Sequence, residues 1–273
     1  MSNFQLPTGR ARPVVKLSAG DPRRHTLMVG RLSLQIGDAP VDLELAVPPG
    51  PVAAEDLMPV FQGLTNLVVS RGVEKAAASG RTVSCRAGCG ACCRQVVPIS
   101  EPEARDLARV VDAMPAGRQA HVRARFDAAL AQLEPTGLLD RAQDLKPEEI
   151  AAFGLEWFAQ AVACPFLEDE ACSIHPDRPL ACRQYLVTSP AENCRTPSRE
   201  TIEMVALPGD PAAALRQASG KSWLPLVVAL RVAAGPPAPR RDRTAPEILK
   251  DVIGRLGTEA GARSSPMPSG PAS

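Results

Sequence analysis

Eight cysteines are the residues of this sequence whose types and spacing can do chemistry, and they fall into two groups. The first group is the run C-x3-C-x2-C-C within "SCRAGCGACCRQ", and it contains Cys85, Cys89, Cys92 and Cys93. The second group is spread over a Pro-rich, charged stretch and contains Cys164, Cys172, Cys182 and Cys194. Cysteines that served only as small core residues would be scattered more evenly. Thiolates that converge from loops are ligands of zinc ions and iron–sulfur clusters, so we expect all eight to bind metal.

The residues around the first group favour ligation. Gly88 and Gly90 flank Cys89 and free the backbone for a tight loop that turns successive sulfurs inward. Arg86 and Arg94 are expected to offset the charge of thiolates and to lower the pKa of the thiols.

The adjacent pair Cys92 and Cys93 argues against a single mononuclear site, because the side chains of neighbouring residues usually diverge. One of the two is therefore expected to serve a second metal, a bridging position or a substrate, unless Cys93 is only a buried thiol. His175 lies between Cys172 and Cys182, and it is either a nitrogen ligand or a hydrogen-bonding loop residue.

Three stretches of the sequence resemble the putative zinc- or iron-chelating domain family, whose members are often called YkgJ-type cysteine-cluster proteins. The stretches are "CRAGCGACCRQ", "CPFLEDEACSIHPDRPLACRQY" and "VTSPAENC", which span about residues 85 to 195. The most specific parts are C-G-A-C-C, C-P-F-L and the R-P-x-x-C-R pattern from Arg178 to Arg183. The resemblance implies a cysteine-bound metal centre in a small bacterial protein, without one settled reaction. His175 departs from the pattern, where an aromatic residue is expected.

The metal is left open between zinc and an iron–sulfur cluster. Structural zinc sites usually show paired C-x2-C motifs, and in this sequence only Cys89 and Cys92 have that spacing. A C-x3-C-x2-C run suits an iron–sulfur cluster at least as well, with a fourth ligand from the distant group. One centre needs four of the cysteines, whereas two centres would use all eight.

Three functions follow from these features. The first is a metal-binding protein whose centre is structural or redox-active. The second is a metal-dependent protein-lysine methyltransferase, implied by a likeness to flagellin lysine N-methylases. The third is a thiol-based metal-handling or redox-sensing protein, in which Cys93 is the free thiol. Whether the protein is an enzyme is left open.

Composition and charge limit the classes of partner that we expect for this protein. The chain has 273 residues and a net charge of +1, which gives no overall reason to expect nucleic acid as a partner. The longest apolar run, "WLPLVVALRVAAG", is shorter than the roughly 20 residues that span a bilayer, so no membrane association is expected. The N-terminus lacks the apolar core of a secretory signal, so we expect a cytoplasmic location, where thiols stay reduced. The metal ion is the expected partner, and a protein partner is left open.

Hydrophobic periodicity predicts an α+β protein that is mainly helical, with an N-terminal β-hairpin and helices around a cysteine-rich loop core. Apolar residues alternate on both sides of "GDAP", which predicts the hairpin. Ser100 and Glu103 form a predicted capping box at the start of a helix. Further helices are predicted from Ala54, over about 118–134 and 147–162, and in "PAAALRQAS" and "APEILKDVIGRLG". The segment "TIEMVAL" is a predicted short strand, and "WLPLVVALRVAAG" fits a buried helix or a strand.

The predicted organisation has five parts. They are an irregular lead-in at 1–25, a hairpin and helix at 26–84, the cysteine-cluster metal-binding domain at 85–200, a C-terminal α/β extension with a basic Pro-rich linker at 201–257, and a disordered tail at 258–273.

Overall fold

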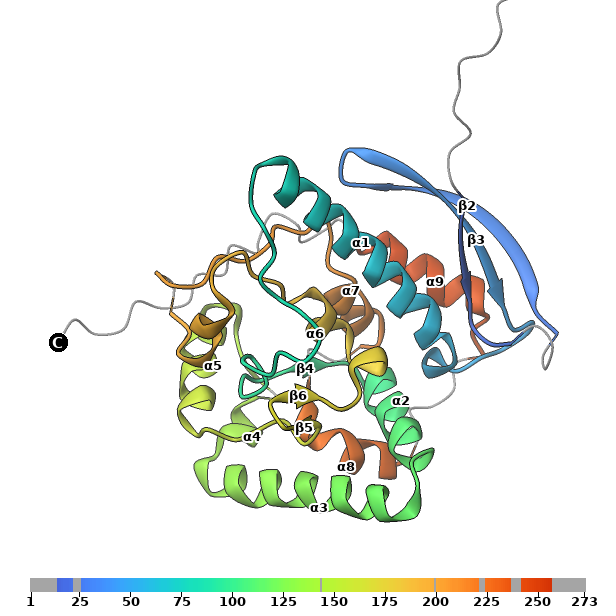
Figure 1. Cartoon of the computed structure of the whole chain (residues 1–273). Coiled ribbons are helices and arrows are strands. Elements are labelled where there is room, and N and C mark those ends of the chain that lie inside the picture. The colour runs from blue at the N-terminus through green and yellow to red at the C-terminus, as the bar shows by residue number, and fades with distance from the viewer. Residues whose placement is uncertain are drawn as a thin grey trace, which may run out of the picture.

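The computed structural model describes residues 14–21, 26–142, 144–198, 200–220, 224–236 and 242–256, and within them the chain is mainly helical with small sheets (Figure 1). This confirms the predicted α+β, mainly helical class. The helices are α1 (Met58–Ala78), α2 (Glu101–Asp112), α3 (Ala116–Leu133), α4 (Leu138–Arg141), α5 (Ile150–Ala159), α6 (Leu180–Gln184), α7 (Pro211–Ala218), α8 (Ala229–Ala234) and α9 (Ala245–Gly254). The strands are β1 (Val14–Ser18), β2 (Met28–Ile36), β3 (Ala39–Val47), β4 (Pro98–Ile99), β5 (Leu167–Glu168), β6 (Ala171–Cys172) and β7 (Leu224–Pro225).

The N-terminal sheet contains the predicted hairpin. Strands β2 and β3 pair antiparallel, and Gly37 at φ +63° makes the turn in the left-handed conformation that glycine tolerates. The sheet order is β1-β3-β2, with β1 parallel to β3. The prediction of an irregular lead-in over 1–25 is therefore wrong for Val14–Ser18. A parallel partner is not joined by a tight turn, so no local signal marks this strand.

Helix α1 covers the sheet because its apolar face repeats at helical spacing. Phe61, Leu64 and Val68 are almost completely buried, and Pro59 is tolerated in the first turn. A Cβ atom at Gly63 would fall 2.5 Å from Leu17 Cδ2, so glycine permits the close approach of α1 to β1. The resulting core also contains residues of α7 and α9, such as Leu215 and Ile248. The segments 26–84 and 201–257 thus share a core, while the proposed domain boundaries stay a prediction.

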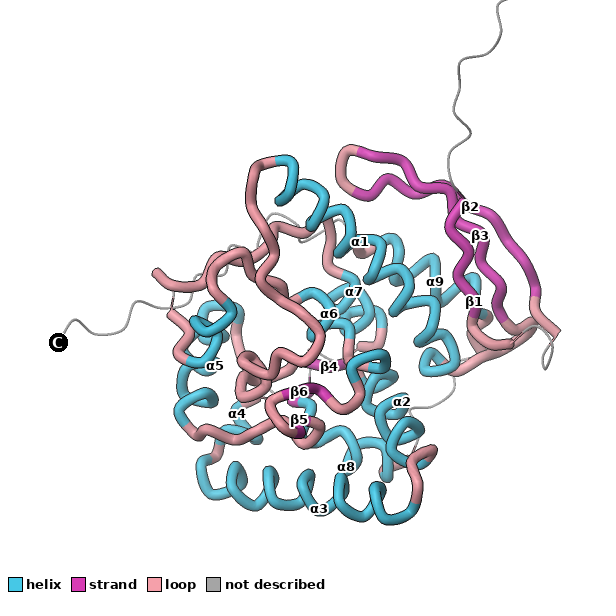
Figure 2. The backbone as a smooth tube through the Cα atoms, viewed as in Figure 1, coloured by secondary structure: helices cyan, strands magenta, loops and turns pink. Residues whose placement is uncertain are grey.

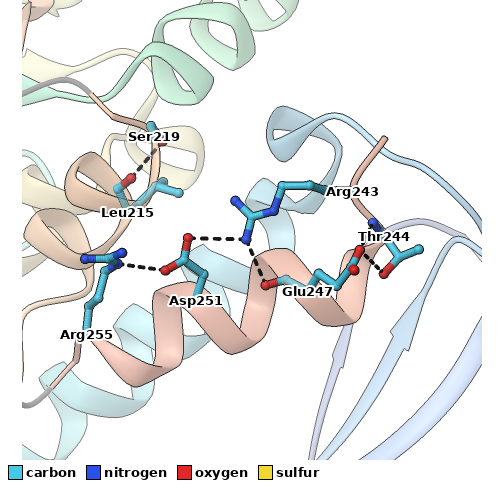
Figure 3. Close-up of polar contacts among 7 residues, drawn as sticks. All are labelled: Leu215, Ser219, Arg243, Thr244, Glu247, Asp251 and Arg255. Carbon is cyan, nitrogen blue, oxygen red and sulfur yellow. Dashed lines mark hydrogen bonds and ion pairs between the residues drawn. The ribbon is translucent and has the colours of Figure 1, made fainter. Parts of the chain in front are cut away.

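Helix α9 is held at both ends by polar contacts (Figure 3). At its start, Glu247 accepts hydrogen bonds from the backbone N–H of Thr244 at 2.7 Å and from its hydroxyl at 2.8 Å. Further along, Asp251 pairs with Arg243 at 3.2 Å and with Arg255 at 2.8 Å. These contacts stabilise the ends of α9, while its apolar residues pack in the core that it shares with the sheet.

Helices α2, α3, α5 and α8 form the other side of the molecule (Figure 1). The predicted capping box of α2 is confirmed, since Glu103 accepts from the backbone N–H of Ser100 at 2.7 Å. Helix α3 confirms the helix predicted over 118–134, and α5 lies within the one predicted over 147–162. Phe126 of α3 meets Phe166 edge to face, with ring centroids 5.3 Å apart. This contact joins α3 to the second cysteine segment.

The C-terminal segment differs in part from expectation. The predicted strand "TIEMVAL" is wrong, because it contributes only an isolated bridge from Met204 to Val187. "WLPLVVALRVAAG" begins with strand β7, which pairs with β4, and continues into α8, so it contains both candidate structures. Residues 237–241 of the predicted linker and the tail at 258–273 lie outside the described residues. No helix in the described ranges is long and apolar enough to cross a bilayer.

Candidate metal centre

All eight cysteines are free thiols, and all eight line one cavity of about 220 Å³. Because a water molecule occupies about 30 Å³ in the liquid, the cavity has the volume of roughly seven waters. It is therefore larger than one ion requires. The two cysteine segments run as loops through the middle of the molecule, between the helices (Figure 2).

The first cysteine segment turns tightly through local hydrogen bonds. The backbone N–H of Cys89 donates to the carbonyl oxygen of Arg86 at 3.2 Å, and that of Cys93 donates to Gly90 at 3.0 Å. Gly88 has φ +84°, which confirms the predicted need for glycine beside Cys89. Gly90 serves a different purpose, because a Cβ atom there would fall 2.4 Å from the carbonyl oxygen of Glu170.

The second cysteine segment is brought against the first by a hairpin. Strands β5 and β6 pair Leu167 with Cys172 across a turn in which Asp169 and Glu170 have positive φ. Glu170 forms an ion pair with Arg94 at 2.7 Å. This pair is the largest influence on Arg94, whose pKa it raises, so Arg94 is engaged chiefly by a carboxylate rather than by thiolates.

Helix α6 carries Cys182 to the cavity wall and is anchored by buried polar groups. Glu103 accepts a hydrogen bond from the backbone N–H of Leu180 at 2.9 Å. The buried guanidinium of Arg183 donates to the carbonyl oxygen of Arg178 at 3.0 Å and to that of Pro176. The Arg183 guanidinium therefore holds the loop before α6 through its carbonyl oxygens. The hydrogen bond from Leu180 to Glu103 could not be predicted, because a capping box in the sequence gives no signal of a further, distant partner.

The segment that contains the cysteines is similar to a known protein family. Residues 84–202 match the family model described as a putative zinc- or iron-chelating domain. Over this range the chain is similar to that family. All eight cysteines lie within the matched range, so the similarity to a zinc- or iron-chelating domain covers the segments that line the cavity. No curated protein and no solved structure was found to match the chain, and the likeness to flagellin lysine N-methylases is not among the findings.

Burial raises the pKa of most of the thiols that line the cavity. Loss of solvent raises the pKa of Cys164 to about 12 and that of Cys194 to about 11. Burial also raises the pKa values of Cys85, Cys172 and Cys182. Buried thiols therefore hold their protons until a cation compensates the charge of the thiolates.

Unlike these buried thiols, Cys92 has a lowered pKa. A hydrogen bond with the Cys93 side chain lowers the pKa of Cys92 to about 7, and the same bond raises the pKa of Cys93. Cys92 therefore carries the first thiolate of the cavity, and Cys93 is its proton donor.

Six of the eight thiols that line the cavity pack in two different hydrophobic clusters. One set packs around Ala91 and Val187, and it consists of Cys85, Cys89, Cys92 and Cys194. The backbone N–H of Val187 donates to Cys85 Sγ at 3.4 Å. In the other set, Cys164 and Cys172 pack against the core that contains Phe166 and Ile174. In the described ranges, no three Cys, His, Asp or Glu side chains form a ready-made group that could hold an ion. Ligation therefore requires cysteine side chains to rotate toward a common point.

Arg178 provides a test of whether the cavity suits an anionic metal–thiolate group. Its side chain lines the cavity, and its buried Nε has no hydrogen-bond partner. A buried donor without an acceptor is costly, and a thiolate bound to metal would supply the acceptor. The soft donor set, the volume and this donor all fit zinc or iron. His175 also lines the cavity, so its role as a nitrogen ligand stays a prediction.

Proposed function

We propose that this protein binds zinc or an iron–sulfur cluster through the thiolates that line its cavity. The observation that supports this is the convergence of every cysteine of the chain on one cavity. The family match covers all of these residues and concerns the same two metals. The ligand set stated from the sequence, all eight cysteines, is the set proposed.

The residues that line the cavity have different roles in metal binding. Cys92 is deprotonated most easily, because Cys93 donates a hydrogen bond to it, and so Cys92 is the first thiolate to meet the metal. The remaining thiols lose their protons as the cation replaces them. Burial raises the pKa of Cys85, Cys172 and Cys182, and the positive charge of Arg178 partly opposes this rise, which favours the thiolate forms. When bound, zinc would crosslink the two segments, and an iron–sulfur cluster would add the capacity to carry an electron.

The metal content of the isolated protein tests this proposal. The full chain is purified without oxygen, and iron, sulfide and zinc are measured together with the UV–visible spectrum. We expect stoichiometric zinc, or iron with matching sulfide. Cys85→Ser, Cys92→Ser and Cys182→Ser should each lower the metal content, whereas Ser84→Ala beside the first cysteine should not. Full metal retention in all three folded cysteine variants would contradict the proposal.

The identity of the bound metal decides which of the more specific functions suggested by the sequence is tested next. Iron with sulfide supports an electron-carrying role, which a reductant tests through loss of visible absorbance. Methyl transfer is then tested by adding S-adenosylmethionine and a lysine-containing protein, and redox sensing by reversible oxidation of the thiols. Stoichiometric zinc supports a structural centre instead.

A further inference from the structure

The number and arrangement of the thiols indicate how many metal centres the cavity can hold. Eight thiols are twice the number that one zinc ion or one iron–sulfur cluster takes from cysteine. The cavity is larger than a single ion requires, and six of its thiols pack in two different hydrophobic clusters. A single centre would leave half of these thiols without a ligand role.

The adjacent pair Cys92 and Cys93 lies where the two sets meet. Cys92 packs with the first set, around Ala91 and Val187. The carbonyl oxygen of Cys93 accepts a hydrogen bond of 2.7 Å from the backbone N–H of Cys164, which belongs to the second set. The thiols of Cys92 and Cys93 hydrogen-bond to each other, so this pair lies at the boundary between the two sets.

We propose that the cavity holds two metal centres, each bound by four thiolates. The first centre takes Cys85, Cys89, Cys92 and Cys194. The second centre takes Cys93, Cys164, Cys172 and Cys182. The proposal rests on the proposed function and divides its ligands into two sets.

Arg178 is the charged group common to both sets. Its side chain lines the cavity together with the thiols of both sets, and its buried Nε has no hydrogen-bond partner. Two thiolate-rich centres close together would repel each other, and a guanidinium within reach of both reduces that repulsion. A cation that served one centre alone would not need this position.

Zinc titration of the metal-free full chain tests the number of centres. The titration is done under reducing, oxygen-free conditions and read by native mass spectrometry. We expect two zinc ions per wild-type chain. A limit of one ion would overturn the two centres and leave the proposed function intact. Failure to bind zinc, in a chain that is also isolated without iron, would overturn both.

Paired variants test which cysteines share a centre. Cys89→Ala and Cys172→Ala should each bind one zinc ion, which is half of the wild-type amount. The double variant within one set, Cys89→Ala with Cys194→Ala, should still bind one ion. The double variant across the sets, Cys89→Ala with Cys172→Ala, should bind none tightly. Equal loss in both double variants would overturn the division, and circular dichroism shows which variants are folded. The wild-type count decides between one and two centres even where a variant does not fold.

Discussion

The backbone N–H of Cys164 donates a hydrogen bond of 2.7 Å to the carbonyl oxygen of Cys93, so the end of the first cysteine segment is joined to the start of the second. Gly90 and Glu170 meet in the same region, where glycine leaves room for the carbonyl oxygen of Glu170. The contact between the two segments, rather than either segment alone, creates the cavity.

Gly90→Ala should separate the two segments. The new Cβ atom would fall 2.4 Å from the carbonyl oxygen of Glu170 and 2.5 Å from Leu167 Cδ1, so the backbone must shift. Overpacking of this kind costs about 1–3 kcal/mol. We expect a lower midpoint of thermal unfolding together with a lower metal content.

The matched control for this variant is Gly154→Ala in α5, where the added Cβ atom has nothing within 4 Å. Alanine is favoured over glycine inside helices by about 1 kcal/mol, so this variant should be neutral or more stable. Equal stability and metal content in both variants would show that the segments tolerate separation.

Glu103→Ala should destabilise the fold by about 2 kcal/mol, because it leaves buried backbone N–H donors without acceptors. Glu103 is 1% exposed and accepts from Ser100 at one oxygen and from Leu180 at the other. Loss of the second contact should also lower metal content, since α6 carries Cys182. Urea unfolding measures the first effect. Glu247→Ala removes a similar cap from α9, where the Glu247 side chain is exposed, and should cost less without changing metal content.

Asp106→Asn should raise stability at neutral pH. Burial raises the pKa of Asp106 from 3.8 to about 6, with a smaller opposing effect from Arg109. A carboxyl whose pKa is higher in the folded state favours folding while it is protonated, so its contribution is complete below about pH 4 and is lost as the pH rises past 6. We expect a gain on the order of 1 kcal/mol at pH 7, allowing for partial exposure, that fades toward pH 4. Unfolding measured at both pH values checks this, and a constant difference would assign the effect to another cause.

Arg178→Gln should make metal binding more sensitive to acid. Burial raises the pKa of several cavity thiols and Arg178 partly opposes this rise, so its loss strengthens the competition of protons with metal. The pH at which half of the metal is released should rise by about 0.5 to 1 unit. Arg178→Lys keeps the charge and should shift less. Arg86→Gln removes an exposed charge at the cavity wall, where solvent screens it, and should have little effect.

Local signals predicted the elements that depend on neighbouring residues. The alternation around "GDAP" predicted the hairpin, and Ser100 with Glu103 predicted the start of α2, because both depend on contacts within a few residues. Strand β1 was missed because its parallel partner leaves no turn to recognise. The spacing of the cysteines indicated the site. It could not show that Arg178 lines the cavity with the thiols of both sets or that Glu103 supports α6, because these contacts depend on how distant segments pack.

Leu226 also belongs to the wall of the cavity, and β7 just before it pairs with β4. A ribosome makes the chain from its N-terminus, so every cysteine is synthesised before this part of the wall exists. The nascent chain therefore presents its thiols in an unfinished pocket, exposed to oxidants and to adventitious metals, until translation has passed Leu226.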